Sequence, residues 1–157
     1  DKLLQYPNLM LVRSFSKAFS AAGLRFGYAI SSAENIYELS KVLTTFHTSI
    51  LNQAFALSLL EHQDIFKAQV QQTIKLREEL FSTLQKIEEV KVYPSATNFL
   101  TFSLYERTPD FFKYLLVNDF AVRDVGSHPC LQNCLRVTVS CREEVDAFVI
   151  AVKQFLD

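Results

Sequence analysis

The order of apolar and polar positions in the first part of the chain predicts two strands followed by two helices. The apolar runs 9–12 and 25–30 predict the strands, the first of them buried in a parallel sheet. Ser31 and Glu34 have the spacing of a capping box, which predicts that a helix begins there. Residues 50–60 are apolar nearly all round, and this pattern predicts a buried helix.

A long amphipathic helix is predicted at 64–89. Apolar residues recur at helical spacing along one face, while lysine, glutamine and glutamate occupy the other. The segment contains neither glycine nor proline, so the pattern indicates one continuous helix. We expect a helix of this length to bridge two parts of a structure.

Strands and helices alternate in the last part of the chain. Thr108 and Pro109 are typical of a helix start, and Ser140 with Glu143 has the spacing of a second capping box before a last helix with one apolar face. Strands are predicted at 90–93, 98–104, 121–125 and 135–139. These elements predict an α+β unit whose antiparallel or mixed sheet is backed by helices.

The pattern therefore predicts an α/β protein in three segments. Residues 1–62 supply too few elements to cover both faces of a sheet, so we expect them either to pack on the last segment or to belong to a larger domain that begins upstream. Residues 63–89 form the long helix, and residues 90–157 form the small α+β domain.

Composition and charge exclude several classes of protein. With 49% hydrophobic and 21% charged residues, the chain of 157 residues is not dominated by disorder. A net charge of −1 provides no overall field for nucleic acid or an anionic membrane. No apolar run reaches the roughly 18 residues that a membrane span needs, and the N-terminus lacks the apolar core of a signal peptide. We therefore expect a cytoplasmic location, with no nucleic acid or membrane as partner.

Cysteine and histidine usage argues against a disulfide framework or a metal site. The three cysteines are an odd number without a C-x-x-C pair, and the three histidines are scattered. Reduced thiols are the simplest interpretation. Glycine is more informative, because two of the three glycines, Gly23 and Gly27, lie in one short stretch.

That stretch, residues 14–27, carries the candidate chemistry. Ser14, Ser16, Lys17 and Arg25 place two hydroxyls and two cations between the two predicted strands, and ligands of open α/β sheets bind at strand ends. Hydroxyls, backbone amides and a guanidinium together bind phosphate well. A lysine shielded beside them can attack a carbonyl carbon. The alternative is an ordinary loop with an exposed lysine and an arginine in a salt bridge.

The same stretch resembles a known motif, S-x-S-K-x-x-x-x-x-G-x-R-x-G, the pyridoxal-phosphate lysine motif of fold-type I aminotransferases. Every fixed position of the motif is met in this sequence. The resemblance implies that Lys17 bonds covalently to pyridoxal 5'-phosphate and later shuttles a proton. It also implies that Ser14, Ser16 and Arg25 bind the phosphate of that cofactor.

Further segments are similar to one group of these enzymes, the histidinol-phosphate aminotransferases. Pro94 to Leu100 reads P-S-A-T-N-F-L and resembles their P-S-x-A-N-F-L strand. V-R-D-V at 122–125 and C-L-R-V-T-V at 134–139 resemble their closing block. The resemblance runs in the family's order through essentially the whole chain. It implies the fold of the C-terminal part of a pyridoxal-phosphate-dependent transferase: part of the large-domain sheet, the interdomain helix and the small domain.

Two arginines of that closing block are implied to hold the anionic end of the substrate, and they fall on Arg123 and Arg136. Strand alternation independently places Arg136 on the face opposite Leu135. Structural salt bridges are the alternative for both arginines. Asn98 is a further candidate substrate contact, with a hydrogen bond to nearby backbone as its alternative role.

The implied activity is transfer of an amino group between L-glutamate and imidazole-acetol phosphate, in histidine biosynthesis, by a homodimer acting on small molecules. Related aminotransferases for aromatic or other amino acids, threonine-phosphate decarboxylase-like lyases, and a non-catalytic folded module remain open. Residues 139–145 depart from the family's V-G-T-x-E-E-N, which leaves the exact substrate open. Family members are more than twice this long, and their upstream half supplies further cofactor contacts. We therefore expect the 157-residue chain alone to bind cofactor weakly and to be inactive.

Overall fold

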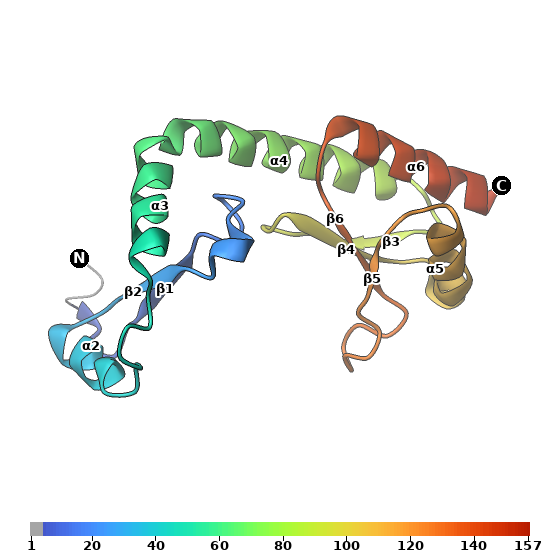
Figure 1. The fold of residues 1–157 in the computed structure, drawn as a ribbon. Helices are drawn as coiled ribbons and strands as arrows, with labels where there is room; N and C mark the ends of the chain where they lie inside the picture. The colour runs from blue at the N-terminus through green and yellow to red at the C-terminus, as the bar shows by residue number, and fades with distance from the viewer. Residues whose placement is uncertain (1–4) are drawn as a thin grey trace. The chain divides into compact units, whose positions relative to one another are not determined.

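A computed structural model describes residues 5–157, which fold as two compact units. The first unit extends to Gln69, and the second unit is Val70–Asp157 (Figure 1). Helix α4, Gln63–Leu84, contains the boundary, so one continuous helix contributes to both units. The predicted long helix is confirmed and ends five residues earlier than its pattern indicated.

The first unit is built on an antiparallel pair of strands, β1 (Leu11–Ser14) and β2 (Gly27–Ile30), in register from Leu11 opposite Ile30 to Ser14 opposite Gly27. The prediction of a buried parallel strand is wrong for this chain, because β1 pairs antiparallel and Val12 is 72% exposed. An apolar run indicates a preference for burial, but it specifies neither the direction of the partner strand nor what covers the faces.

The helix after β2 begins one residue later than predicted. Helix α2 spans Ala33–Ser40, and the Ser32 side chain caps it by accepting a hydrogen bond from Asn35 N. Ser31, the predicted cap, instead donates its hydroxyl hydrogen to Leu9 O at 2.6 Å. Both serines suit the position, and this contact with the start of β1 decides between them.

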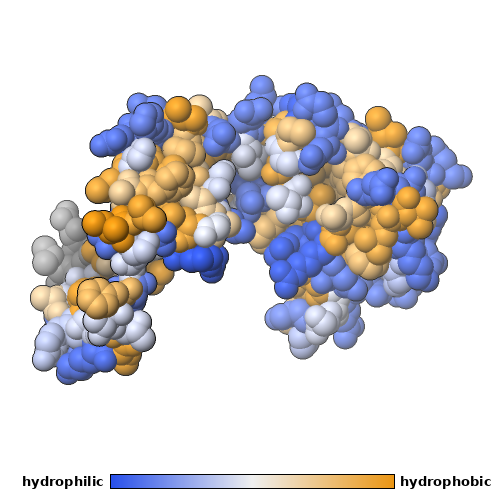
Figure 2. All heavy atoms as spheres, in the orientation of Figure 1, coloured by the Kyte–Doolittle hydropathy of each residue, from blue (hydrophilic) through white to orange (hydrophobic). Residues whose placement is uncertain are grey.

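Helix α3, Ile50–Glu61, forms where predicted but is not buried. Ala56 is its only buried residue among those described, whereas Ile50 is 80% exposed and Phe55 52% exposed. Figure 2 shows apolar residues gathered at the surface over this helix. A helix that is apolar on all sides needs covering on all sides, and the first unit covers one side only.

The second unit contains a four-stranded antiparallel sheet in the order β3-β4-β6-β5. The strands are β3 (Lys91–Tyr93), β4 (Phe99–Ser103), β5 (Arg123–Asp124) and β6 (Leu135–Thr138). Helices α5 (Thr108–Val117) and α6 (Arg142–Leu156) complete the unit. This arrangement confirms the predicted α+β unit with an antiparallel sheet backed by helices.

A continuous apolar core joins the sheet of the second unit to its helices. Phe102 of β4, Phe111 of α5 and Phe148 of α6 are fully buried, and their ring centroids lie 5.6–6.5 Å apart. Leu80 and Leu84 of α4 pack into the same cluster. The apolar periodicity of three separate helices therefore converges on one side of the sheet.

Both predicted helix caps in this unit are displaced. Thr108 is the first residue of α5 rather than its cap, and its hydroxyl accepts a hydrogen bond from Leu104 N at 2.8 Å. Cys141 occupies the N-cap position of α6, while the Ser140 hydroxyl donates to the Glu144 carboxylate. In each case the polar side chain satisfies a neighbouring group instead of the helix terminus.

Candidate functional site

The loop between β1 and β2 is held closed by an extension of the strand ladder. Beyond the last paired residues, Phe15 N donates a hydrogen bond to Phe26 O at 3.1 Å. Ser14 and Ser16 flank Phe15 in sequence, and Arg25 precedes Phe26. This one hydrogen bond therefore brings the predicted hydroxyls and the predicted guanidinium-bearing residue to the same end of the strand pair.

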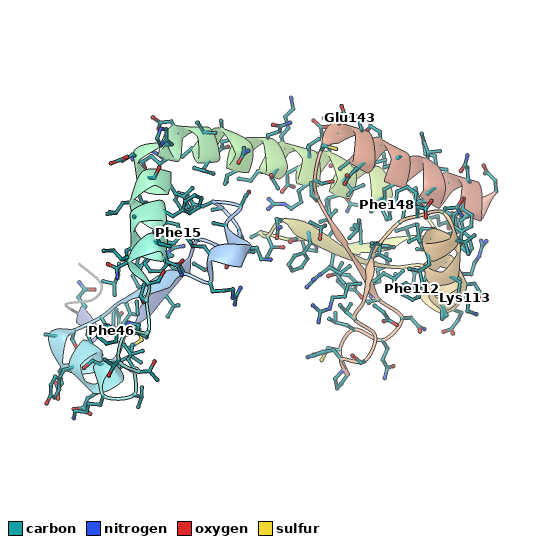
Figure 3. The ribbon with its side chains drawn as sticks, in the orientation of Figure 1. Phe15, Phe46, Phe112, Lys113, Glu143 and Phe148 are labelled. Atoms are coloured by element: carbon teal, nitrogen blue, oxygen red, sulfur yellow. The ribbon has the colours of Figure 1, made fainter. Side chains whose placement is uncertain are left out.

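The loop contains both an apolar cluster and a hydrogen-bonded pair of hydroxyls. Phe15 is 2% exposed, with its ring centroid 5.6 Å from that of Phe26 and 4.9 Å from that of Phe19 (Figure 3). Ser14 is exposed and Ser16 half-buried, and neither is part of this apolar cluster. Their hydroxyls are joined, because Ser14 Oγ donates to Ser16 Oγ at 2.8 Å and accepts from Ser16 N at 3.1 Å.

Lys17 begins a tight turn immediately after the serine pair. Ser20 N donates to Lys17 O at 2.9 Å, and Ala21 N then donates back to Phe15 O at 3.1 Å. The Lys17 side chain is exposed, and within residues 5–157 its amine takes part in no ion pair or hydrogen bond. The lysine is thus fixed at its backbone while its amine stays available.

Arg25 adopts a backbone conformation that side chains seldom take. Its φ is 50°, in the left-handed region, and its Nη1 donates to Ala22 O at 3.1 Å. Such a conformation costs about 1–3 kcal/mol in a residue other than glycine. Arg25 adopts this conformation as the C-terminal cap of the short 3-10 turn Ala22–Leu24.

Gly27 is required by the closeness of the two strands. A Cβ at this position would lie 2.5 Å from the backbone oxygen of Arg13, which leaves no room for a side chain. Gly23 is different, because a Cβ there would meet nothing within 4 Å and its φ is not positive. Of the two glycines in the motif, only Gly27 is explained by packing within the described residues.

One residue that positions this loop was not predicted. Asn52 of α3 donates its side-chain amide to Leu24 O at 3.0 Å, and Ala56 of the same helix packs against Phe15. These contacts fix α3 against the turn that leads into Arg25. The sequence offers no signal for Asn52, since a single asparagine in an apolar helix has no spacing that relates it to a loop 28 residues away.

The predicted substrate arginines are direct cross-strand partners in the second unit. Arg123 of β5 lies opposite Arg136 of β6, and Thr101 of β4 lies opposite Arg136 on its other side. Residues opposite each other in an antiparallel pair share a face, so both arginines stand on one face of the sheet. The antiparallel register places together two cations that are 13 residues apart in sequence.

This arginine pair has no internal counter-charge. Neither side chain forms an ion pair with a carboxylate in the part of the chain that the structure describes. Asp124, the nearest carboxylate in sequence, accepts a hydrogen bond from Gly126 N at 2.7 Å. Like charges directly opposite each other destabilise a sheet, which points to an anionic ligand as their partner.

Asn98 precedes β4 and is held by its backbone. Its carbonyl accepts a hydrogen bond from Val139 N at 2.9 Å, and its half-buried side chain has no hydrogen bond to any residue of 5–157. The turn before it is anchored by Arg77 of α4, which donates from Nη1 to Thr97 O at 2.8 Å. Arg77 is buried, and no pattern in the sequence indicates this role for it.

The structure thus brings the predicted residues together in two groups. Ser14, Ser16, Lys17 and Arg25 belong to one loop of the first unit. Arg123 and Arg136 share a sheet face in the second unit. Asn98 belongs to the same unit and directly precedes β4. Residues 5–157 contain no cluster of histidine, cysteine and carboxylate side chains placed to hold a metal ion. No helix in that range has both the length and the apolar character needed to cross a membrane.

Comparison with known proteins identifies the family. The family model described as aminotransferase class I and II matches residues 1–152, and the chain belongs to this family. It is 35% identical over 153 residues to histidinol-phosphate aminotransferase of Vesicomyosocius okutanii, covering 98% of this chain and 43% of that protein. The enzyme of the same name from Caldanaerobacter subterraneus is 36% identical, again with 43% covered. The chain therefore spans about 43% of the length of these relatives.

Solved structures show the same fold. Histidinol-phosphate aminotransferase from Clostridium acetobutylicum superposes with a TM-score of 0.89 at 20% identity, over 98% of this chain and 47% of that one. The enzyme from Sinorhizobium meliloti, solved with pyridoxal-5'-phosphate, gives 0.77 at 26% identity over 93% and 40%. L-threonine-O-3-phosphate decarboxylase from Porphyromonas gingivalis gives 0.87 at 24% identity over 99% and 49%. The predicted fold, a portion of a pyridoxal-phosphate-dependent transferase, is confirmed.

Proposed function

We propose that this chain is part of a histidinol-phosphate aminotransferase, which transfers an amino group between L-glutamate and imidazole-acetol phosphate in histidine biosynthesis. The observation that carries the proposal is the loop in which Lys17 directly follows a hydrogen-bonded serine pair while the Phe15–Phe26 contact brings Arg25 alongside. The relatives named above, at 35–36% identity, support the choice of substrate.

The residues of this loop fit the phosphate end of pyridoxal 5'-phosphate. Two hydrogen-bonded hydroxyls and one guanidinium supply the donors that a phosphate group needs. Ser14 and Arg25 are exposed, and Ser16 is half-buried. The strained backbone of Arg25 is explained if its guanidinium serves that ligand. Ser14, Ser16 and Arg25 are therefore the residues proposed to hold the cofactor.

When bound, the cofactor supplies an electron sink for the charge that develops at the substrate carbon. The protein supplies binding, orientation and proton transfer. Lys17 is the residue proposed to bond covalently to the cofactor. The amine of the substrate would displace it from that bond, and the freed Nζ would then take up and return a proton at the substrate carbon. Its exposed, unpaired amine is compatible with both roles, since a lysine in an ion pair would have to break that pair first.

Arg123 and Arg136 are proposed to bind the anionic end of the substrate. Their position on one sheet face, without a carboxylate partner, suits the phosphate of one substrate and the carboxylate of the other. Asn98 is proposed as an additional polar contact, because its side chain is half-buried and its backbone is fixed by Val139.

A decarboxylase acting on a phosphorylated amino acid is the second candidate. The support is the similarity to two solved decarboxylases, one of which, from Sulfurospirillum multivorans, is 28% identical with a TM-score of 0.83. Both candidate reactions use the same lysine loop and an anionic substrate. Two assays separate the candidates: amino transfer from L-glutamate to imidazole-acetol phosphate, and release of carbon dioxide from phosphorylated amino acids.

The 157-residue chain alone is proposed to bind cofactor weakly and to be inactive, because it holds only the phosphate end of the ligand. Each missing charge-assisted contact is worth about 1.5–3 kcal/mol, and each ~1.4 kcal/mol weakens binding tenfold. We further propose a homodimeric cytoplasmic enzyme, whose oligomeric state light scattering measures. In the domain division proposed for it, residues 1–62 belong to the large domain, 63–89 form the interdomain helix and 90–157 form the small domain.

The decisive experiment replaces Lys17 in the longer protein of which this chain is proposed to be part. Lys17→Ala is expected to abolish both the visible absorbance of the lysine-bound cofactor and amino transfer. Arg25→Ala is expected mainly to weaken cofactor affinity. Lys41→Ala is the matched control, because Lys41 lies in the same unit and pairs with Glu38 at the surface. Normal turnover by Lys17→Ala would contradict the proposed function.

A further inference from the structure

The Arg136 side chain rests on an aromatic ring. Its guanidinium carbon lies 4.6 Å from the centroid of the Phe99 ring, within the range of a cation–π contact. Phe99 begins β4, where it pairs with Thr138, and Thr101 two residues later pairs with Arg136. Phe99, Thr101 and Arg136 therefore share the sheet face that also carries Arg123.

The position of Arg136 is costly in the absence of a ligand. Its Nε is buried and has no hydrogen-bond partner within the described residues. A buried donor that loses water without gaining a partner destabilises the fold, and the opposing Arg123 adds repulsion. A guanidinium that served only the fold would be expected to pair with a carboxylate instead.

An aromatic ring orients a guanidinium in a way that a carboxylate does not. A carboxylate partner would occupy the in-plane N–H groups, which are the groups that bind a phosphate or carboxylate ligand. A ring contacts the flat face of the guanidinium and leaves those edges free. Phe99 thus restrains the Arg136 side chain without consuming its terminal donors.

We propose that Phe99 is a positioning residue for substrate binding: its ring holds the Arg136 guanidinium flat, so that the Nη atoms stay oriented toward the anionic end of the ligand. This inference rests on the proposed function of Arg136. The contribution of Phe99 is to affinity for the anion, and it adds no group that touches the reacting atoms.

The test uses nuclear magnetic resonance on the 157-residue chain, with succinate and inorganic phosphate as probes. The backbone amides of Thr101 and Thr138 report binding at this face and separate it from binding at the Ser14–Arg25 loop. The variants are Phe99→Leu, which removes the ring, and Phe99→Tyr, which retains it. Phe112→Leu is the matched control, because Phe112 is also a partly buried ring packed against the core of the second unit but lies on α5 (Figure 3).

Phe99→Leu is expected to weaken binding of both probes about two- to thirtyfold, as loss of a cation–π contact predicts. Phe99→Tyr and Phe112→Leu are expected to bind within about twofold of the unchanged chain. The Arg136 Nε–H signal gives a readout that general destabilisation does not mimic: in Phe99→Leu it should lose its ring-current shift and exchange faster with water. Phe99→Met replaces Phe99→Leu if the latter does not fold.

Several outcomes overturn the inference. Unchanged affinity in Phe99→Leu with an unchanged Arg136 signal would do so, as would equal weakening in Phe112→Leu. Arg136→Ala separates this failure from failure of the proposed function. If Arg136→Ala abolishes binding while Phe99→Leu does not, the anion site stands and Phe99 has no role in it. If the unchanged chain binds neither probe at this face, both the anion site and the role of Phe99 are wrong for this chain.

Discussion

The two units of this chain use apolar residues to opposite effect. In the second unit, 15 buried residues of the sheet, three helices and their connections form one cluster, whereas the cluster in the described part of the first unit has three: Phe15, Ala21 and Ala56. The first unit is not poorer in apolar residues, since α3 is apolar nearly all round and is largely exposed. Apolar content therefore does not measure a core, because burial also needs elements on the other side.

The same contrast separates the two groups of candidate site residues. Arg136 stands on a sheet whose other parts are packed into a core, so its position is set by tertiary structure. Lys17 stands in a loop fixed chiefly by local backbone hydrogen bonds and by one helix. We expect the lysine loop to depend on short-range geometry and the arginine pair to depend on the stability of the second unit.

The largest expected effect is on the free energy of unfolding, and it tests the contrast in burial between the two units. Phe148→Ala removes a fully buried ring from the core of the second unit and should lower the free energy of unfolding by about 3–5 kcal/mol. Phe55→Ala, on the exposed side of α3, should change it by less than about 0.5 kcal/mol. Urea denaturation followed by circular dichroism measures both, and equal losses would mean that the two units are packed alike.

An intermediate effect concerns the backbone of the lysine loop. Gly27→Ala forces a Cβ to within 2.5 Å of Arg13 O, and we expect the strands to separate at a cost of about 1–3 kcal/mol. Gly23→Ala is the matched control, because its Cβ meets nothing within 4 Å and its effect should stay within about 0.5 kcal/mol.

Hydrogen exchange at the amides of residues 11–14 and 135–139 measures the Gly27→Ala effect locally. Gly27→Ala should speed exchange at residues 11–14 and leave 135–139 unchanged. Faster exchange at 135–139 as well would show that the lysine loop is coupled to the second unit. That result would contradict the expectation that the loop depends on short-range geometry.

The smallest effect is a pH dependence at the start of α6. The pKa of Glu143 is lowered, first by a hydrogen bond from its own backbone N–H and then by one from the Cys141 side chain. Burial opposes this shift, and the charge of Arg142 makes the smallest contribution to lowering the pKa. A lowered folded-state pKa means that the stabilisation is present above the unfolded value and is lost as the pH falls through the folded value. The Tm difference between the unchanged chain and Glu143→Gln should therefore be larger at neutral pH than in acid. The opposite trend would show that the carboxylate destabilises the helix.

The elements of the fold follow from the sequence more closely than their ends do. Each α-helix lies where apolar periodicity or a capping signal predicts it, but three predicted starts are displaced. Ser31, Thr108 and Ser140 each bond a neighbouring group, and a capping box cannot reveal that competing partner. The apolar run also could not predict the antiparallel pairing of β1 or its exposure, because both depend on which elements lie around the strand.

The candidate site divides in the same way. Residues that act through local spacing, such as Ser14, Ser16 and Lys17, are visible in the sequence as a motif. Arg123 and Arg136, which meet through tertiary structure, were found only through the resemblance of their segments to a known family. No role was predicted for Asn52, which reaches the loop from a helix, or for Phe99, which meets Arg136 only because β4 and β6 pair in one register. A site residue can be predicted from the sequence when the residues it acts with are close to it in the chain, whatever its chemical type.

Strand β5 has a consequence for self-association through the sheet of the second unit. It is an edge strand of the sheet and consists of Arg123 and Asp124 alone. The other edge strand, β3, is three residues long and begins with Lys91. Long apolar edge strands pair readily with strands of other molecules, whereas short charged edge strands do not. Arg123 therefore also disfavours fibrillar self-association through this edge strand. Arg123→Val would remove its charge and add an apolar residue to an exposed edge.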